Sequence, residues 1–173
     1  MNQAPTCNHK SSSLQVIEVD SAEYLVGNLF KRRFNTDTFP QEPFHFVAFA
    51  KSKDGSLSTL GYVHYYIDGE DALCGGLVID NRNYRKLSAS DRGAIRDQGG
   101  VAQLLLTHSF AKLPNNLVGI WGYVGDKQSK KVCLRSGFET TYHKHILVVW
   151  RASSLTDEQK TLHVKRIESI GAF

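Results

Sequence analysis

The sequence predicts an α/β (α+β) protein built on a mixed, mostly antiparallel sheet of six to seven strands that is flanked by helices. Three strand-like segments, 44–50, 57–67 and 72–79, follow one another with short turns between them. Hairpin connections of this kind join antiparallel strands. A strand, a helix and a strand come later in the chain, and a helical crossover joins parallel strands. We therefore expect a sheet that is antiparallel at first and parallel where the helix crosses.

The first half of the chain supplies most of the expected strands. A strand at 14–19 precedes a helix that Asp20 or Ser21 can cap, because their side-chain oxygens can accept from its first amides. Residues 32–43 contain two prolines and break the helical pattern. Turn sequences at 53–55 and 68–71 then separate the three strands in series.

The second half alternates helices and strands. Residues 81–98 lose apolar periodicity and are expected to be irregular. Gly99-Gly100 then opens an apolar run, 101–113, that predicts a helix buried on much of its surface. The remaining expected elements are a strand at 117–124, a helix at 126–136, a strand pair or one long bent strand at 138–150, and a helix at 155–170 capped by Ser153 or Ser154.

Length and composition favour one globular domain. The chain has 173 residues, of which 41% are hydrophobic and 22% charged. These values exclude collagen-like, coiled-coil and wholly disordered classes. Residues 1–13 are expected to form a disordered lead-in, and residues 14–173 a single domain. The three cysteines (Cys7, Cys74 and Cys133) form no C-x-x-C pair, and no apolar run is long enough to span a bilayer, so we expect a cytoplasmic protein without a membrane partner.

The net charge is mildly positive. Lys and Arg number 21 and Asp and Glu 17, which leaves a formal charge of +4. The corresponding isoelectric point is about 9.0. A basic surface is typical of nucleic-acid binders, so that class is an alternative to be tested by filter binding. The excess is too small to make it the leading interpretation, and we expect no nucleic-acid partner.

The junction between strand 77–79 and the helix opened by Gly99-Gly100 is the first candidate site. A helix start presents unpaired backbone N–H groups and the positive end of the helix dipole, which together suit an anion such as pyrophosphate. Two glycines before a helix can also be a simple turn. The spacings typical of nucleoside triphosphate and dinucleotide sites are absent.

The helix at 126–136 is the second candidate. Ser129 and Cys133 lie on one stripe of this helix with other small residues, while Lys127, Lys131 and Arg135 lie on another at a spacing of four. One face can pack and the other is cationic. Taken alone, this pattern is more typical of a solvated basic face.

Taken together, these segments resemble the GNAT superfamily of acyl-CoA-dependent N-acyltransferases. The similarity covers residues 14–150, and its most specific parts are 75–106 and 124–138. The family's phosphate-binding pattern is Arg/Gln-x-x-Gly-x-Gly/Ala, and Asp97-Gln98-Gly99-Gly100-Val101-Ala102 supplies the Gly and the Ala with Asp97 in the leading place. Arg85 or Arg96 can replace the missing basic residue in space.

The resemblance implies a GNAT-like sheet splayed at its centre, after Ile79, and a co-substrate that is acetyl-CoA or another acyl-CoA. It implies transfer of the acyl group to a primary amine of a small molecule or peptide, by direct attack in a ternary complex. No metal is expected: His143 and His145 share a strand face, but no third ligand is evident. The cofactor-binding residues implied are Leu77, Val78, Ile79, Arg85, Gln98, Gly99, Gly100, Val101, Ala102, Gln103, Asp126 and Ser129.

The catalytic side chains are less well defined. Some relatives use a Glu on the strand before the glycine helix, but residues 72–76 contain no carboxylate, and His64 is the best candidate base. Cys133 stands where the family commonly has a Tyr that protonates the leaving thiolate, and it is either that acid or a packed core residue. A catalytically silent GNAT-like acyl-CoA-binding or regulatory module is therefore the alternative function.

Two further expectations concern partners. The irregular stretch 32–43 would shape the amine acceptor site through Phe34, Phe39, Asp37 and Glu42. The last helix carries Leu162, Ile167 and Ile170, and it either covers the sheet or joins a second copy in a homodimer.

Overall fold

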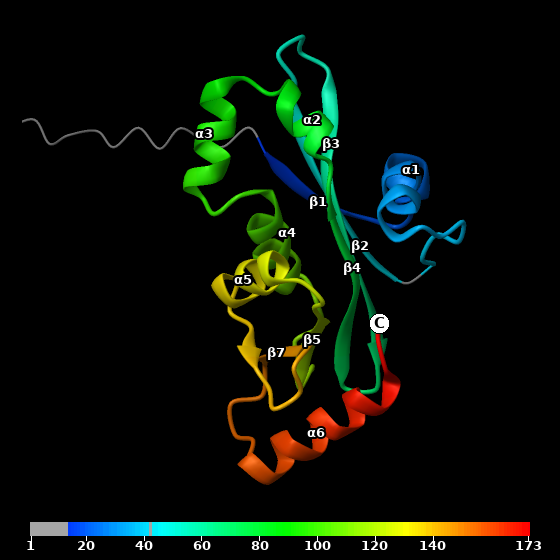
Figure 1. Cartoon of the computed structure of the whole chain (residues 1–173), viewed down its shortest axis with the longest axis vertical. Helices are drawn as coiled ribbons and strands as arrows, with labels where there is room; N and C mark the ends of the chain where they lie inside the picture. Colours follow the sequence, from blue (N-terminus) through cyan, green and yellow to red (C-terminus); the bar gives the residue numbers. More distant parts are fainter. Residues whose placement is uncertain (1–13, 42) are drawn as a thin grey trace, which may run out of the picture.

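A twisted sheet runs through the centre of the computed structural model, which describes residues 14–41 and 43–173 (Figure 1). Within these residues the sheet has seven strands in the order β1-β2-β3-β4-β5-β7-β6. Neighbouring strands are antiparallel except β4 and β5, which are parallel. The predicted mixed, mostly antiparallel sheet is confirmed. The expected lead-in at 1–13 and Glu42 lie outside the described residues.

The elements follow the predicted order along the chain except at residues 81–98. The strands are β1 (Gln15–Val19), β2 (Phe44–Lys51), β3 (Leu57–Asp68), β4 (Asp71–Ile79), β5 (Gly119–Tyr123), β6 (Glu139–Thr140) and β7 (Ile146–Trp150). The helices are α1 (Glu23–Phe34), α2 (Asn81–Lys86), α3 (Ala89–Asp97), α4 (Val101–Phe110), α5 (Lys127–Arg135) and α6 (Asp157–Ile170). No helix in the described ranges combines the length and apolar character needed to cross a membrane.

Helices cover both faces of the sheet (Figure 1). α4 packs on one face, where Leu105 joins the largest buried cluster. α1 and α6 pack on the other face in two separate clusters. Tyr62 of β3 belongs to the α1 cluster and Tyr66 contacts the α6 cluster. Residues four apart on a strand share a face, so α1 and α6 lie on the same side of the sheet.

Residues 81–98 are helical, contrary to expectation. They form α2 and α3, and each begins at a side-chain cap. The Asp80 carboxylate accepts from the amides of Arg82, at 2.8 Å, and Asn83, at 3.2 Å, and the Ser88 hydroxyl accepts from the amide of Asp91 at 3.0 Å. Apolar periodicity misses such helices because short helices capped at the surface bury few residues.

The caps expected for α1, at Asp20 or Ser21, and for α6, at Ser153 or Ser154, are wrong. α1 follows Ala22, which makes no side-chain cap, and this helix is held by the buried Val26 and Phe30. α6 is capped by Thr156, whose side chain and that of Gln159 form a capping box. The last helix covers the sheet, as one of the two expectations stated.

The sheet opens between its two parallel strands. β4 pairs with β5 from Asp71↔Gly119 to Cys74↔Gly122. Beyond Cys74 the β4 strand stays paired with β3, and a register shift at His64/Tyr65 turns it away. A bulge bends the strand that contains it, so the divergence has a local cause. The opening therefore begins at Gly75, earlier than the position after Ile79 that we expected.

Candidate functional site

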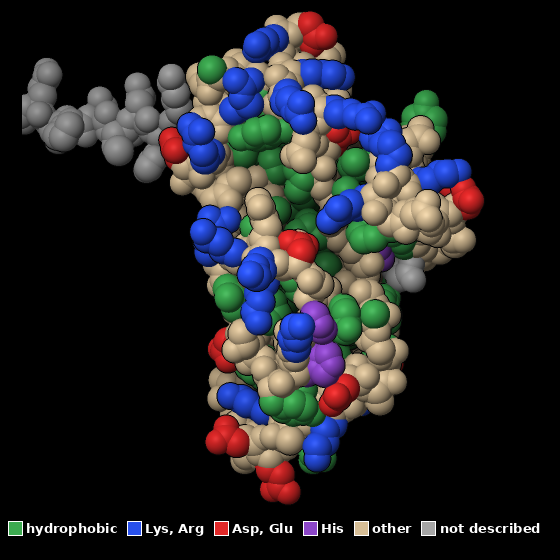
Figure 2. Space-filling view, in the orientation of Figure 1, with side chains coloured by type: hydrophobic (Ala, Val, Ile, Leu, Met, Phe, Trp, Pro, Cys, Tyr) green, Lys and Arg blue, Asp and Glu red, His purple; other side chains and the backbone are tan. Residues whose placement is uncertain are grey.

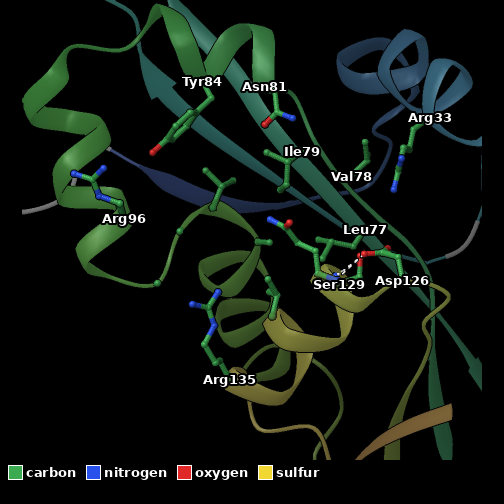
Figure 3. Close-up of a pocket in the computed structure, with 16 residues that line it drawn as sticks. Arg33, Leu77, Val78, Ile79, Asn81, Tyr84, Arg96, Asp126, Ser129 and Arg135 are labelled. Carbon is green, nitrogen blue, oxygen red and sulfur yellow. Dashed lines mark hydrogen bonds between the residues drawn. The ribbon is translucent and has the colours of Figure 1, made fainter. Parts of the chain in front are cut away.

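A cavity of about 670 Å³ lies between the second half of β4 and the starts of α4 and α5, and we call it the outer cavity. Figure 3 shows side chains from both sides of the sheet opening directed toward this space. Its walls include most of the predicted cofactor-binding residues: Leu77, Val78, Ile79, Gly99, Gly100, Val101, Ala102, Asp126 and Ser129.

Three predicted residues do not line this cavity. Arg85 is exposed on α2, and its carbonyl accepts from Arg92 Nη1 at 3.3 Å. Gln98 is exposed at the end of α3. Gln103 bridges two helices instead, because its Nε2 donates to the Arg135 carbonyl at 3.3 Å.

The amides at the start of α4 divide into two groups. The N–H groups of Gly99 and Gly100 already donate to the carbonyls of Arg96 and Ile95 at the end of α3, each at 2.9 Å. Both glycines have a positive φ, 95° and 91°, which other residues rarely adopt. In the described part of the chain, the amides of residues 101–103 have no acceptor. These three, rather than the glycine amides, are the donors that an anion can meet.

Arginines from three helices surround the outer cavity. Arg33 comes from α1, Arg96 from α3 and Arg135 from α5, and Figure 3 shows them on different sides of the space. Among the described residues none of the three has an ion-pair partner within 4.0 Å. Figure 2 shows Lys and Arg side chains gathered around the upper part of the hollow. The resulting positive potential suits a ligand with several phosphate charges.

Asp126 sets the start of α5 at the edge of this cavity. Its carboxylate accepts from the amides of Gln128 and Ser129, each at 2.9 Å, and from the Ser129 hydroxyl at 2.6 Å. The Ser129 side-chain hydrogen bond is the largest of several contacts that lower the Asp126 pKa. Asp126 and Ser129 therefore form a helix cap, and the cap uses amides that would otherwise point at a ligand.

A second cavity, of about 240 Å³, lies where β4 and β5 separate, and we call it the inner cavity. Gly75 and Gly76 of β4 form one wall, and Gly122 and Tyr123 of β5 form part of the other. The residues that line both cavities are Arg33, Leu77, Asp126 and Ser129. The two cavities therefore adjoin and form one path from the surface to the opening of the sheet.

His64 is buried behind the wall of the inner cavity and lines neither cavity. Its ring stacks on Tyr62 and meets Phe30 edge-on, with centroids 5.5 Å and 5.7 Å away. Its Nδ1 has no hydrogen-bond partner among the described residues. Burial lowers the pKa of His64 to about 4, and the nearby His45 adds to the shift. His64 is thus a neutral, packed side chain near neutral pH.

Cys133 lines the inner cavity and is 7% exposed. Burial raises the pKa of the Cys133 thiol to about 11 and that of the neighbouring Cys74 to about 12. Both thiols stay protonated at neutral pH and are poor nucleophiles there. This environment favours the packed-residue interpretation of Cys133.

The expected acceptor-site residues are dispersed. Phe34 lines the inner cavity. Phe39 is buried against Phe30, and Asp37 pairs with Lys31. No group of three or more potential ligands for a metal occurs within residues 14–41 and 43–173.

Sequence reasoning missed two residues of the site. Arg33 reaches the outer cavity because α1 packs across the sheet, and no local pattern reports that placement. Tyr123 could have been singled out as the last residue of a strand that borders an opening, since ligands in open α/β sheets bind beyond the strand ends.

Comparisons with known proteins bear on the fold. No family model matches the chain, and no curated protein matches it. A Pyrococcus horikoshii protein described provisionally as an acetyltransferase has a TM-score of 0.50 and 12% identity, over 82% of this chain and 48% of that one. This chain thus spans about half the length of that protein.

Two further solved structures are similar at lower scores. One is the E. coli protein YhhK, described provisionally as an N-acetyltransferase and bound to coenzyme A, with a TM-score of 0.49, 14% identity and coverage of 79% of this chain and 98% of that one. The other is the catalytic domain of the Tetrahymena histone acetyltransferase GCN5 in complex with coenzyme A. Its TM-score is 0.44 and its identity 11%, with coverage of 82% of this chain and 94% of that one. At 12% identity the likeness to the Pyrococcus horikoshii protein shows the fold alone, and the chain has the GNAT-like fold that the sequence predicts.

Proposed function

We propose that this protein is an acyl-CoA-dependent N-acyltransferase, most simply an acetyltransferase, that acts on a primary amine of a small molecule or peptide. The observation that carries the proposal is the continuity of the two cavities. A cationic outer cavity at the start of α4 leads into a smaller one where the central strands separate. A coenzyme A thioester has the matching form, with phosphates at one end and a reactive acyl group at the other.

The outer cavity accounts for the phosphate end. The free amides of residues 101–103 and the positive end of α4 face it, and Arg33, Arg96 and Arg135 surround it. Backbone donors and arginines together are the usual means of holding phosphate groups. The 3′-phosphate and the pyrophosphate would spread over these arginines, while the adenosine would lie toward the solvent.

The separated part of β4 accounts for the pantetheine arm. From Gly75 to Ile79 the edge of β4 that faces β5 has no strand partner in the described part of the chain. Its N–H and C=O groups can pair with the two amide groups of pantetheine as an added strand would. One such N–H would also polarise the thioester carbonyl, and a preorganised donor of this kind is typically worth about 3 kcal/mol at a developing oxyanion.

The inner cavity would hold the thioester and admit the amine. The amine must attack as a neutral nucleophile, so its proton leaves to a base or to water. His64 does not line this cavity and is buried, so direct contact between His64 and the amine would require the Phe34 side of the wall to move. Water is the simpler acceptor of that proton.

Binding of acetyl-CoA to the purified protein tests the proposal at its first step. Titration calorimetry should detect binding of acetyl-CoA, and a saturating concentration of acetyl-CoA should raise the melting temperature of the protein. Ala102→Glu places a carboxylate among the free amides of α4, in a helical position without backbone strain, and should weaken binding about 100-fold or more. Ala111→Glu, at the exposed far end of the same helix, is the matched control and should bind as the wild type does.

The result separates the leading function from its alternatives. No binding at millimolar acetyl-CoA would reject the proposal. Tight binding without thiol release in a broad panel of amines would identify a silent acyl-CoA-binding module instead. Equal affinity in the Ala102→Glu variant would show that the phosphates bind elsewhere.

A further inference from the structure

Two phenylalanine rings border the inner cavity on the face of the sheet that carries α1 and α6. Phe34 is the last residue of α1, and its Cζ lies 3.0 Å from the place that a Cβ on Gly76 of β4 would take. Phe173 follows α6, where the chain turns back toward the middle of the sheet (Figure 1). Its ring meets that of Tyr123 of β5 edge-on, at a centroid distance of 6.1 Å. Both phenylalanines line the inner cavity, one beside each of the separated strands.

The inner cavity is lined from both faces of the sheet. Leu106, Cys133 and Phe138 line it and belong to the buried cluster under α4. Phe34 and Phe173 lie on the opposite face, with the clusters of α1 and α6. The outer cavity adjoins the starts of α4 and α5. If the thioester enters from the outer cavity, the face with the two rings is the side left for the acceptor.

Each of the two rings is supported by the protein and still partly exposed. Phe34 packs on Phe30, with ring centroids 4.5 Å apart, and remains 40% exposed. Phe173 packs against the α6 cluster and is also partly exposed. Aromatic rings attract one another edge-on or in offset stacks, beyond the effect of the area that they bury. An aromatic group at the opening would therefore meet a supported ring on the β4 side and another on the β5 side.

The inner cavity has few partners for a second charged group on the acceptor. Its charged lining residues are Arg33 and Asp126, and both also line the outer cavity. None of the other described residues that line it is Asp, Glu, Lys, Arg or His. Under the proposed function Arg33 would face the phosphates, and Asp126 is engaged in the cap of α5. A carboxylate or a second ammonium group would lose its water here without gaining a partner.

We propose that the acceptor is a primary amine with an uncharged aromatic body, which lies between Phe34 and Phe173 while its nitrogen reaches the thioester. This assignment rests on the proposed function. The ammonium form gives one proton to water, and the neutral nitrogen then bonds to the thioester carbon. The carbon–sulfur bond breaks with its electron pair going to sulfur, and the nitrogen loses a proton to water while the sulfur takes one up. The products are the N-acylated amine and the free coenzyme A thiol.

Acceptors that differ in one feature test this assignment. 2-Phenylethylamine has the ring and no second charge, ethylamine lacks the ring, hexylamine has a flexible apolar chain in its place, and phenylalanine adds a carboxylate. Release of the thiol from acetyl-CoA, followed by a colour reaction, gives kcat/KM for each amine. We expect the value for 2-phenylethylamine to exceed those for ethylamine and phenylalanine about 100-fold, and that for hexylamine about 5-fold.

Variants of the two rings test where the aromatic group binds. Phe34→Leu and Phe173→Leu each remove one ring and keep an apolar side chain. Each should lower the preference for 2-phenylethylamine over ethylamine about 10-fold, chiefly through KM, while the Kd for acetyl-CoA stays within about 2-fold. Tyr24→Leu is the matched control, because it removes a fully exposed ring of α1 outside both cavities, and it should keep the wild-type preference. The melting temperature checks that each variant folds.

Other outcomes would overturn the assignment. Equal kcat/KM for ethylamine and 2-phenylethylamine, faster transfer to phenylalanine than to 2-phenylethylamine, or a preference that survives in both ring variants would refute the assigned acceptor and leave the proposed acyl transfer intact. A protein that binds acetyl-CoA but acylates none of these amines would refute the acceptor and leave the binding part of the proposed function. A protein that does not bind acetyl-CoA would refute the proposed function itself, and the acceptor with it.

Discussion

The outer and inner cavities belong to one path but are built in different ways. The outer cavity depends on main-chain groups at a helix start and on arginines that reach in from α1, α3 and α5. The inner cavity depends on where β4 leaves β5 and on which side chains line the gap. The first needs a positive field over a broad area, so the identity of each residue matters little. Under the proposed function, the second needs particular groups within reach of the thioester.

This difference predicts different responses to mutation. A long-range electrostatic field is shared among several charges and weakens with salt, because ions screen exposed charges. Packing in the inner cavity depends on contacts between neighbouring atoms, so the addition or removal of a single group changes the free energy of unfolding. Changes to the outer cavity should therefore alter ligand affinity, and changes to the inner one should alter stability and chemistry.

The largest effect is expected from reversing two outer-cavity charges. The Arg96→Glu, Arg135→Glu double variant should weaken coenzyme A binding about 100-fold at low salt, because each substitution replaces attraction to phosphate with repulsion. The loss should shrink at high salt. The exposed residues Lys112 and Lys165 provide a control: the Lys112→Glu, Lys165→Glu variant has the same net charge. Equal weakening in both proteins, measured by titration calorimetry, would show that general charge and not the cavity holds the ligand.

A strong effect on stability is expected at Gly75 in the inner cavity. A Cβ atom at this position would clash with Nε2 of His64, so Gly75→Ala should cost about 2.5 kcal/mol of unfolding free energy. At Gly122, on the facing strand, an added Cβ would meet Phe138 at an ordinary 3.4 Å. Gly122→Ala should therefore change the stability by less than about 0.5 kcal/mol.

A double variant identifies the clash as the cause. Removing the imidazole in Gly75→Ala, His64→Ala should recover part of the loss, so that the two single effects do not add. Urea denaturation measures all four proteins. If the losses of unfolding free energy in the two single variants simply add in the double variant, Gly75 is required for its backbone conformation and not because His64 occupies the space beside it.

The next effect concerns the pH dependence of stability. The pKa of His64 falls from its ordinary 6.5 to about 4 on folding, so the unfolded chain binds the extra proton between these values. The stabilisation from His64 is complete above about pH 6.5 and is lost as the pH falls toward 4, by roughly 2 kcal/mol at pH 5. His64→Leu should reduce the difference in unfolding free energy between pH 7.5 and pH 5 by this amount. His108→Leu, on the exposed side of α4, should leave the difference unchanged.

The smallest effect is expected at the cap of α5. Asp126→Ala removes the acceptor of the Gln128 and Ser129 amides and should cost about 1 kcal/mol, whereas Asp126→Asn keeps an acceptor and should cost less. Asp97→Ala, at the other end of a helix and without a cap role, is the control. A similar loss in Asp97→Ala, measured by thermal unfolding, would contradict the cap.

Much of the fold could be predicted because its local signals are strong. The three strands in series, the helix after Gly100 and the helix after Asp126 lie within a few residues of their expected bounds. Residues 81–98 could not be predicted, since α2 and α3 depend on the caps at Asp80 and Ser88 rather than on an apolar stripe. The opening of the sheet was placed too late because a bulge opposite His64 has no signature in strand alternation.

For the site, the sequence determined the parts that depend on chain connectivity. Gly99-Gly100 marks the start of α4 and Asp126 marks the start of α5, although α2 and α3 lie between β4 and α4 along the chain. Tertiary structure decided which side chains line the two cavities: Arg33 and Tyr123 do, while His64 is packed behind the wall of the inner cavity. Backbone geometry is set by neighbours in the chain, whereas proximity across a sheet depends on strand register, bulges and helix packing that no local pattern encodes.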